Sequence, residues 1–305
     1  MRGATPRPRH GDLYAGGMAK FPVSLPESLS GRLPASLATD AGVVPVLRLH
    51  GVIASGGAGL GRQSVSTEGV EPALVRAFET KSARAVALSI DSPGGSPTQS
   101  EQIGLRIRQL AAKHELPVLA FCEDAAASGG YWLACAADEI FANTTSMIGS
   151  IGVVSGGFGF EGLMERLGVE RRLYTTGPAK TRLDPFASER AEDVEWLSDL
   201  QRRLHDEFTR WVIERRGDRL AADHEGLFDG DVWLGRRALE LGLVDGIGTL
   251  RGVLAERYPD AKITMTTPAR PLLARLGFPA ASVESAVAAV AGAAETRAWW
   301  ARLGR

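Results

Sequence analysis

Short apolar segments alternate with helical segments through the first half of the chain, and this alternation limits the fold more than any other feature. Residues 43–49, 85–90, 117–122 and 139–143 are predicted strands. Between them, the spacing of apolar residues in 70–80 and 99–113 predicts two amphipathic helices. Strands separated by helices are joined by right-handed crossovers and form a largely parallel sheet. The sequence therefore predicts an α/β fold with repeated β-α units.

The second half predicts a helix over 161–167, a strand over 171–175 and a long helix over 188–216. The long helix carries an apolar stripe made of Trp196, Leu197, Leu200, Leu204, Phe208, Trp211 and Val212. Such a stripe is usually core packing, whereas an exposed stripe of that length would be a subunit contact. We expect a flexible tail over 1–40, a main domain over 41–258, and a C-terminal strand and helical tail over 259–305.

Composition excludes several classes of protein. The 305 residues are 44% apolar, enough for a sizeable core, and their net charge of −1 argues against a nucleic-acid partner. No apolar run is long enough for a spanning helix, and residues 1–40 contain no secretory apolar region. We expect a cytoplasmic protein, with Met18 as an alternative start. Residues 271–303 predict a packing or disordered tail, or alternatively a helix for subunit or peripheral membrane contact.

No cofactor or metal is expected. Cys122 and Cys135 lack the spacing of a metal site and are predicted to be buried thiols. The glycine pattern over 157–162 matches a dinucleotide-binding loop, but the strand predicted after it ends in Thr175 and Thr176, without an acid to hold a ribose.

Ser128 is the candidate nucleophile. It follows a predicted strand and begins a short helix of small residues. A serine in this position is more often only a helix cap. Its neighbours Ala127 and Gly129 would let a substrate backbone approach closely. Sites also gather at the carboxyl ends of parallel strands, where a helix N-terminus favours negative charge.

The base for such a serine is less obvious. None of the five histidines lies between residues 115 and 204, and His50, which follows a strand, has no evident acid partner but stays open. Ala126 replaces the first glycine of the GxSxG pattern. Arginine stays protonated, whereas a buried lysine can lose its proton near neutrality. Among the few lysines, Lys180 alone lies in a Gly-Pro turn after a predicted strand, so it is a candidate base or, alternatively, a solvated loop charge.

The turn Ser92–Gly95 is the candidate for a third component of a serine active site, after the nucleophile and the base. Its two glycines allow backbone N–H groups to converge on an anion, although an ordinary tight turn is commoner. With a nucleophilic serine nearby, the N–H groups of Gly94 or Gly95 and of Gly129 would form an oxyanion hole.

Six segments occur in the order and spacing of one known family: 92–95, 127–131, 149–153, 177–180, 228–230 and 238–245. Over residues 43–255 the chain resembles the bacterial signal peptide peptidase A (protease IV) family of serine peptidases. The resemblance implies a ClpP/crotonase-like fold and a dyad of Ser128 as nucleophile and Lys180 as base. It also implies a homo-oligomeric ring in which neighbouring subunits contribute the serine and the lysine. Asp91 departs from the asparagine usual in the family, and its N-terminal membrane anchor is missing.

We therefore expect a serine endopeptidase that cleaves leftover signal peptides or other apolar, unfolded segments through an acyl-enzyme. Two alternatives stay open. One is a crotonase-type acyl-CoA enzyme that uses the same oxyanion hole without a nucleophile. The other is a non-catalytic scaffold that binds apolar peptides.

Overall fold

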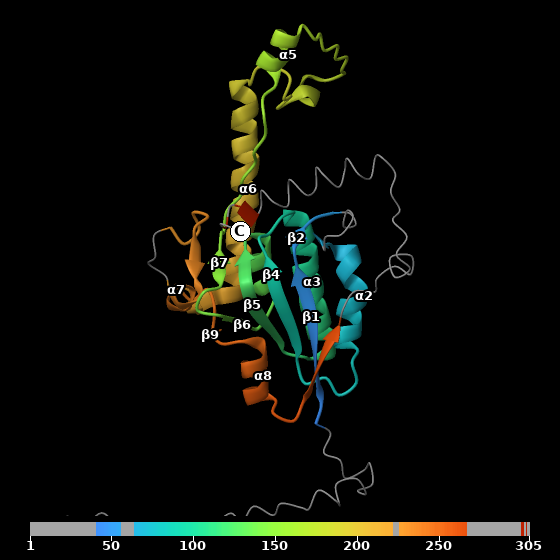
Figure 1. The fold of residues 1–305 in the computed structure, drawn as a ribbon, viewed down its shortest axis with the longest axis vertical. Coiled ribbons are helices and arrows are strands. Elements are labelled where there is room, and N and C mark those ends of the chain that lie inside the picture. The colour runs from blue at the N-terminus through green and yellow to red at the C-terminus, as the bar shows by residue number, and fades with distance from the viewer. Residues whose placement is uncertain (1–40, 56–63, 222–225, 267–299, 302, 304–305) are drawn as a thin grey trace, which may run out of the picture. The chain divides into compact units, whose positions relative to one another are not determined.

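A mostly parallel eight-stranded sheet lies at the centre of the protein in the computed structural model (Figure 1). Six strands follow the order β10-β1-β4-β5-β6-β9, and every neighbouring pair on this path is parallel. Their bounds are β1 Val43–His50, β4 Val86–Ser92, β5 Val118–Ala127, β6 Glu139–Ala142, β9 Gly246–Ile247 and β10 Lys262–Thr266. Strand β7 (Met147–Gly149) pairs with the end of β5 and, antiparallel, with β8 (Val232–Leu234). Strands β2 (Val52–Ile53) and β3 (Ser64–Val65) form a separate pair.

The structure describes residues 41–55, 64–221, 226–266, 300, 301 and 303. The predicted tail over 1–40, with Met18, lies outside the described residues, as does nearly all of the segment 271–303. Within the described ranges, no helix is both long and apolar enough to cross a membrane.

Helices α2 (Thr67–Phe78), α3 (Pro97–His114) and α4 (Gly129–Ala134) pack on one face of the sheet. Ser66 and Ser96 accept a hydrogen bond from the first turns of α2 and α3, so both helices begin at a serine cap. Helix α8 (Leu250–Arg257) contributes Leu254 to a smaller core on the other face. Helix α7 (Gly235–Glu240) follows β8, and a short 3₁₀ helix, η3, spans Gly217–Arg219.

Alternation along β1 explains how one strand serves both cores. Leu47 and Leu49 belong to the larger core, which the helices α2, α3 and α4 cover. Val44 and Val46 point to the opposite face and join the smaller core. Because successive side chains of a strand point to opposite faces, an uninterrupted apolar run is what a strand buried on both faces requires.

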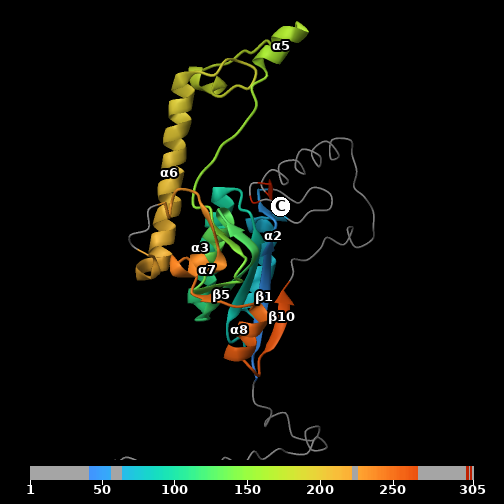
Figure 2. The same ribbon diagram turned by 60° about the vertical axis from the view of Figure 1, so that its left-hand side comes forward.

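Helix α6 (Ala191–Arg216) links this body to a projecting segment (Figures 1 and 2). Near its C-terminal end, Phe208, Trp211 and Val212 are buried in the larger core. Residues 154–200, which we call the arm, contain α5 (Glu161–Leu167), the 3₁₀ helix η2 (Pro178–Thr181) and the first part of α6. The arm is almost entirely exposed, and its apolar side chains include Phe158 at 80% and Tyr174 at 89% exposure.

The predicted α/β fold with repeated β-α units and a long helix in the C-terminal half is confirmed. Predicted strands correspond to β1, β4, β5 and β6, and predicted helices to α2, α3, α5 and α6. The strand predicted over 171–175 is wrong, because this part of the arm has no strand beside it to pair with. Cys122 and Cys135 are buried free thiols, as predicted.

Candidate active site

Ser128 lies in a strained turn between β5 and α4. Its backbone angles are φ 51° and ψ −123°, a conformation that is uncommon for any residue other than glycine. The Ser128 N–H donates to the Gly149 carbonyl of β7 at 2.8 Å, and the side chain makes no capping hydrogen bond to α4. The interpretation of Ser128 as a helix cap is therefore wrong. A strained serine between a strand and a helix is the arrangement of a nucleophile elbow, although Ala126 replaces the usual glycine.

The glycine turn after β4 packs directly against Ser128. Gly94 and Gly95 have φ angles of 102° and 143°, which favour glycine. A Cβ atom on Gly94 would lie 2.7 Å from the Ser128 Cβ and 2.8 Å from the Gly129 nitrogen. The turn is held from the other side by Ile53, whose N–H donates to the Gly94 carbonyl at 2.8 Å. The sequence therefore placed this turn correctly beside Ser128.

The three candidate N–H groups of the oxyanion hole differ in their partners. The Gly94 N–H donates to the Ser92 hydroxyl at 3.2 Å. For the N–H groups of Gly95 and Gly129, no acceptor lies among the described residues. Backbone N–H groups without a partner beside a serine are what stabilisation of an oxyanion requires. Of the three candidates, only the N–H groups of Gly95 and Gly129 have no partner among the described residues and are available to an oxyanion.

Asp91 keeps the hydrogen bond that an asparagine could make at this position. Its Oδ1 accepts a hydrogen bond from the Ala125 N–H at 3.2 Å, and its carbonyl accepts one from the Gly51 N–H at 2.9 Å. An asparagine side-chain oxygen could accept the first bond equally well. The departure from the usual residue therefore leaves the contact between β4 and β5 in place.

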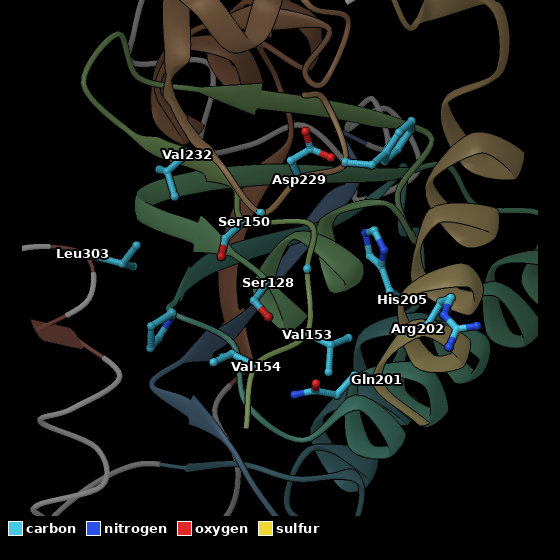
Figure 3. Close-up of a pocket in the computed structure, with 14 residues that line it drawn as sticks. Ser128, Ser150, Val153, Val154, Gln201, Arg202, His205, Asp229, Val232 and Leu303 are labelled. Carbon is cyan, nitrogen blue, oxygen red and sulfur yellow. The ribbon is translucent and has the colours of Figure 1, made fainter. Parts of the chain in front are cut away.

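A cavity of about 660 Å³ opens beside Ser128 (Figure 3). Besides Ser128, its walls come from Pro93 in the turn after β4, from residues 150–154, from the middle of α6, from residues 228–232 and from Leu303. Ser150 lies in this cavity with a φ of 51°, and its N–H donates to the Asp231 carbonyl at 2.6 Å. The sequence pattern over 149–153 contained Ser150 but did not indicate a role for it. Its position next to a conformationally free glycine was the available signal.

Lys180 does not lie in this cavity. It is exposed in η2, within the arm, and its neighbour Arg182 lies 3.6 Å from the carboxylate of Asp193 near the start of α6. From Asp193 to His205, which lines the cavity, α6 extends about 18 Å at the usual rise of an α-helix. The single chain thus brings Ser128, Gly94, Gly95 and Gly129 together and leaves Lys180 apart from them.

His50 is engaged in a separate cluster. Its Nδ1 lies 3.0 Å from the Arg48 guanidinium, so the ring accepts there and its Nε2–H donates to the Ser89 hydroxyl at 2.7 Å. Ser89 in turn donates to Glu123, and the hydrogen bond with His50 is the main cause that lowers the Glu123 pKa. The structure gives His50 the acid partner that the sequence did not reveal, but His50 does not line the cavity of Ser128.

The two cysteines are buried and do not line the cavity of Ser128. Burial raises the pKa of the Cys135 thiol to about 12 and raises the pKa of Cys122 as well. Such thiols remain protonated and are poor nucleophiles. The described part of the chain holds no group of three or more His, Cys, Asp or Glu side chains that could bind a metal ion.

Comparison with known proteins shows the family of this chain. Residues 111–264 match the sequence family described as peptidase family S49. A putative signal peptide peptidase SppA of Enterococcus faecium is 31% identical over 223 residues, which cover 72% of this chain and 64% of that protein. The resemblance inferred from the sequence motifs is thereby confirmed.

Another relative carries a different name. The Na(+)/H(+) antiporter NhaA of Brucella abortus (strain 2308) is 46% identical over 292 residues, which cover 92% of this chain but 39% of that protein. The chain thus spans well under half of the length of that relative.

A solved structure also resembles this chain. It is a 1510-N membrane-bound stomatin-specific protease, a lysine-to-alanine mutant in complex with a substrate peptide, and it is 16% identical at a TM-score of 0.47. It covers 77% of this chain and 95% of the other.

Proposed function

We propose that this chain, which belongs to peptidase family S49, is a serine peptidase that cleaves peptides through an acyl-enzyme on Ser128. The observation that carries the proposal is the strained backbone of Ser128, whose side chain caps no helix, packed against a glycine turn, with the N–H groups of Gly95 and Gly129 left without a partner among the described residues. A helix cap would not need the strain, and an ordinary tight turn would not need to present unpaired N–H groups to a serine.

The reaction follows from these positions. The Ser128 Oγ attacks the carbonyl carbon of the peptide bond while a base takes the hydroxyl proton. The N–H groups of Gly95 and Gly129 donate to the oxyanion that forms. The C–N bond then breaks, the base returns the proton to the leaving amine, and water hydrolyses the resulting ester to free Ser128.

The base in this proposal is Lys180 of a neighbouring subunit. An amine can act as a base only when a dry environment removes its charge, and the single chain leaves the Lys180 segment exposed. The same arm carries a large apolar surface, including Phe158, Leu167 and Tyr174, which suits contact with another copy of the chain. Assembly into a ring would bury both the apolar surface and the amine beside the serine of the next subunit.

The substrate side of the cavity favours an extended apolar peptide. Val153, Val154, Phe228 and Val232 line the cavity, and residues 152–154 form no strand of their own. A peptide could therefore lie beside residues 152–154 and place apolar side chains in the cavity. Leftover signal peptides and unfolded apolar segments both fit this description.

The first test uses covalent labelling. A fluorophosphonate should label the wild-type protein at Ser128, and Ser128→Ala should abolish both labelling and cleavage of an apolar peptide followed by mass spectrometry. Absence of labelling would favour an acyl-CoA enzyme of the crotonase type. Peptides that bind to the protein but stay intact after long incubation would favour a binding scaffold.

The second test addresses the lysine. Lys180→Ala and Lys180→Arg should each abolish cleavage, since arginine keeps the charge but cannot act as a base. Mixing inactive Ser128→Ala with inactive Lys180→Ala should restore about a quarter of the wild-type activity if each site takes its serine and its lysine from different subunits of a ring. An active Lys180→Arg protein would overturn the role of Lys180. A mixture without activity would overturn the sharing of sites between subunits.

A further inference from the structure

Helix α6 changes character where it passes the cavity. Val194, Leu197, Phe208 and Val212 lie on one stripe of the helix and are apolar. Between them on the same stripe lie Gln201 and His205, and both line the cavity beside Ser128 (Figure 3). The apolar stripe is therefore interrupted by two polar side chains next to the candidate nucleophile.

The His205 side chain lacks a partner of its own. Its Nε2 is buried and has no hydrogen-bond partner among the described residues. Two other buried nitrogens share this property, on His114 and Trp132, but neither residue lines the cavity. Buried polar groups in native proteins are nearly always paired, so an unpaired one at a binding cavity points to a ligand as its partner. The broad χ2 well of an imidazole lets the ring turn to present a nitrogen.

The charged side chains of the cavity limit which kind of ligand group could bind beside His205. Arg202 pairs with Asp199 at 3.1 Å, and its side chain turns away from Ser128 in Figure 3. Asp229 lies on another wall of the cavity and disfavours a second carboxylate there. A neutral polar group adds no second negative charge beside Asp229. Gln201 and His205 each offer a donor and an acceptor, and a carboxamide carries the complementary pair.

We propose that Gln201 and His205 form a polar subsite that selects peptides with an asparagine or glutamine side chain close to the bond attacked by Ser128. This inference rests on the proposed function, because it takes the ligand to be a peptide in the cavity of Ser128. Apolar side chains of the same peptide would contact Val153, Val154 and Phe228. A site built to hydrogen-bond one side chain disfavours the analogue that cannot make the bond.

The test measures binding rather than cleavage. Full-length Ser128→Ala protein is titrated with fluorescent ten-residue peptides of alanine and leucine, in which one position at a time carries either glutamine or leucine. At one position, the glutamine peptide should bind about tenfold more tightly than its leucine counterpart, as expected for one or two hydrogen bonds. The ratio should fall to about one in His205→Phe, which keeps a ring without nitrogens, and in Gln201→Met.

Arg203→Leu is the matched control, since Arg203 lies on the outer side of α6 and does not line the cavity. It should keep the tenfold ratio. A protein that shows no glutamine preference at any position overturns the subsite, and so does a preference that survives in both His205→Phe and Gln201→Met. If one of these variants does not fold, the other still decides the question.

Fluorophosphonate labelling separates this inference from the proposed function. Wild-type protein that is labelled at Ser128 but shows no glutamine preference would lose the subsite and keep the peptidase activity. A protein that shows the preference without labelling would keep the subsite and lose the nucleophile.

Discussion

At the residue scale, the decisive feature is the backbone of Ser128. A non-glycine residue in this conformation costs about 1–3 kcal/mol and persists only where the surroundings enforce it. Those surroundings are the Gly149 carbonyl, which accepts the Ser128 N–H, and the close approach of Gly94. The sequence could nominate Ser128 but could not reveal the strain in its backbone, because the contacts that enforce it come from the turn after β4 and from β7.

Gly94→Ala should reduce peptidase activity by about 10²–10³-fold, the effect of disturbing an oxyanion hole. The new Cβ would lie 2.7 Å from the Ser128 Cβ at a φ of 102°, so the turn or the serine must move. Gly104→Ala is the control, because a Cβ at that position would meet its nearest neighbour, Trp132, at an ordinary 3.4 Å and Gly104 does not line the cavity. Initial rates on an apolar peptide measure both. Equal rates for the two variants would contradict the role of the turn.

At the element scale, the sequence predicted correctly those helices and strands whose pattern lies within the element itself. Long apolar segments such as β1 and the periodic helices were recognisable locally. Strands β7, β8 and β9 are two or three residues long and exist only through partners distant in the chain. The strand predicted over 171–175 had the local pattern but no partner. Period alone also could not tell which half of the stripe on α6 is buried.

Two tryptophans of α6 allow the difference between its buried half and its exposed half to be measured. Trp211 is 9% exposed and donates from Nε1 to the Trp132 carbonyl at 3.0 Å, whereas Trp196 is 40% exposed in the arm. Trp211→Ala should lower the free energy of unfolding by about 3–5 kcal/mol. Trp196→Ala should lower it by less than about 1 kcal/mol but should weaken self-association, measured by analytical ultracentrifugation. Equal losses in denaturant unfolding would contradict the division of α6 into a core part and an arm.

At the scale of the whole molecule, a buried ion pair fixes α6 to the sheet. The Arg216 side chain is 1% exposed, and its guanidinium donates to both oxygens of Asp245 and to the Gly242 carbonyl. Asp245 also accepts the Ile140 N–H of β6 at 2.7 Å. Burial alone would raise the Asp245 pKa, but the hydrogen bond and charge of Arg216, with help from Ile140 and Arg219, bring the pKa below its ordinary value.

Asp245→Asn should destabilise the protein at neutral pH by about 3 kcal/mol or more, because Arg216 is left buried without a counter-charge. A carboxyl whose pKa is lowered by folding stabilises the protein above its unfolded pKa of about 4, and this stabilisation is lost as the pH falls through the folded value. The wild type should therefore lose more stability than Asp245→Asn on acidification below about pH 4. Urea unfolding over a pH series measures the difference. Parallel profiles for the two proteins would contradict the pairing.

The distance between Lys180 and the cavity of Ser128 has a physiological consequence if the two groups come from different chains. A newly synthesised molecule would then be latent, since it could not hydrolyse a peptide before it assembled with other copies of the chain. Specific activity would rise steeply with concentration, and dilution would act as an off-switch without any inhibitor. Such a threshold would confine peptide breakdown to places where enough copies accumulate.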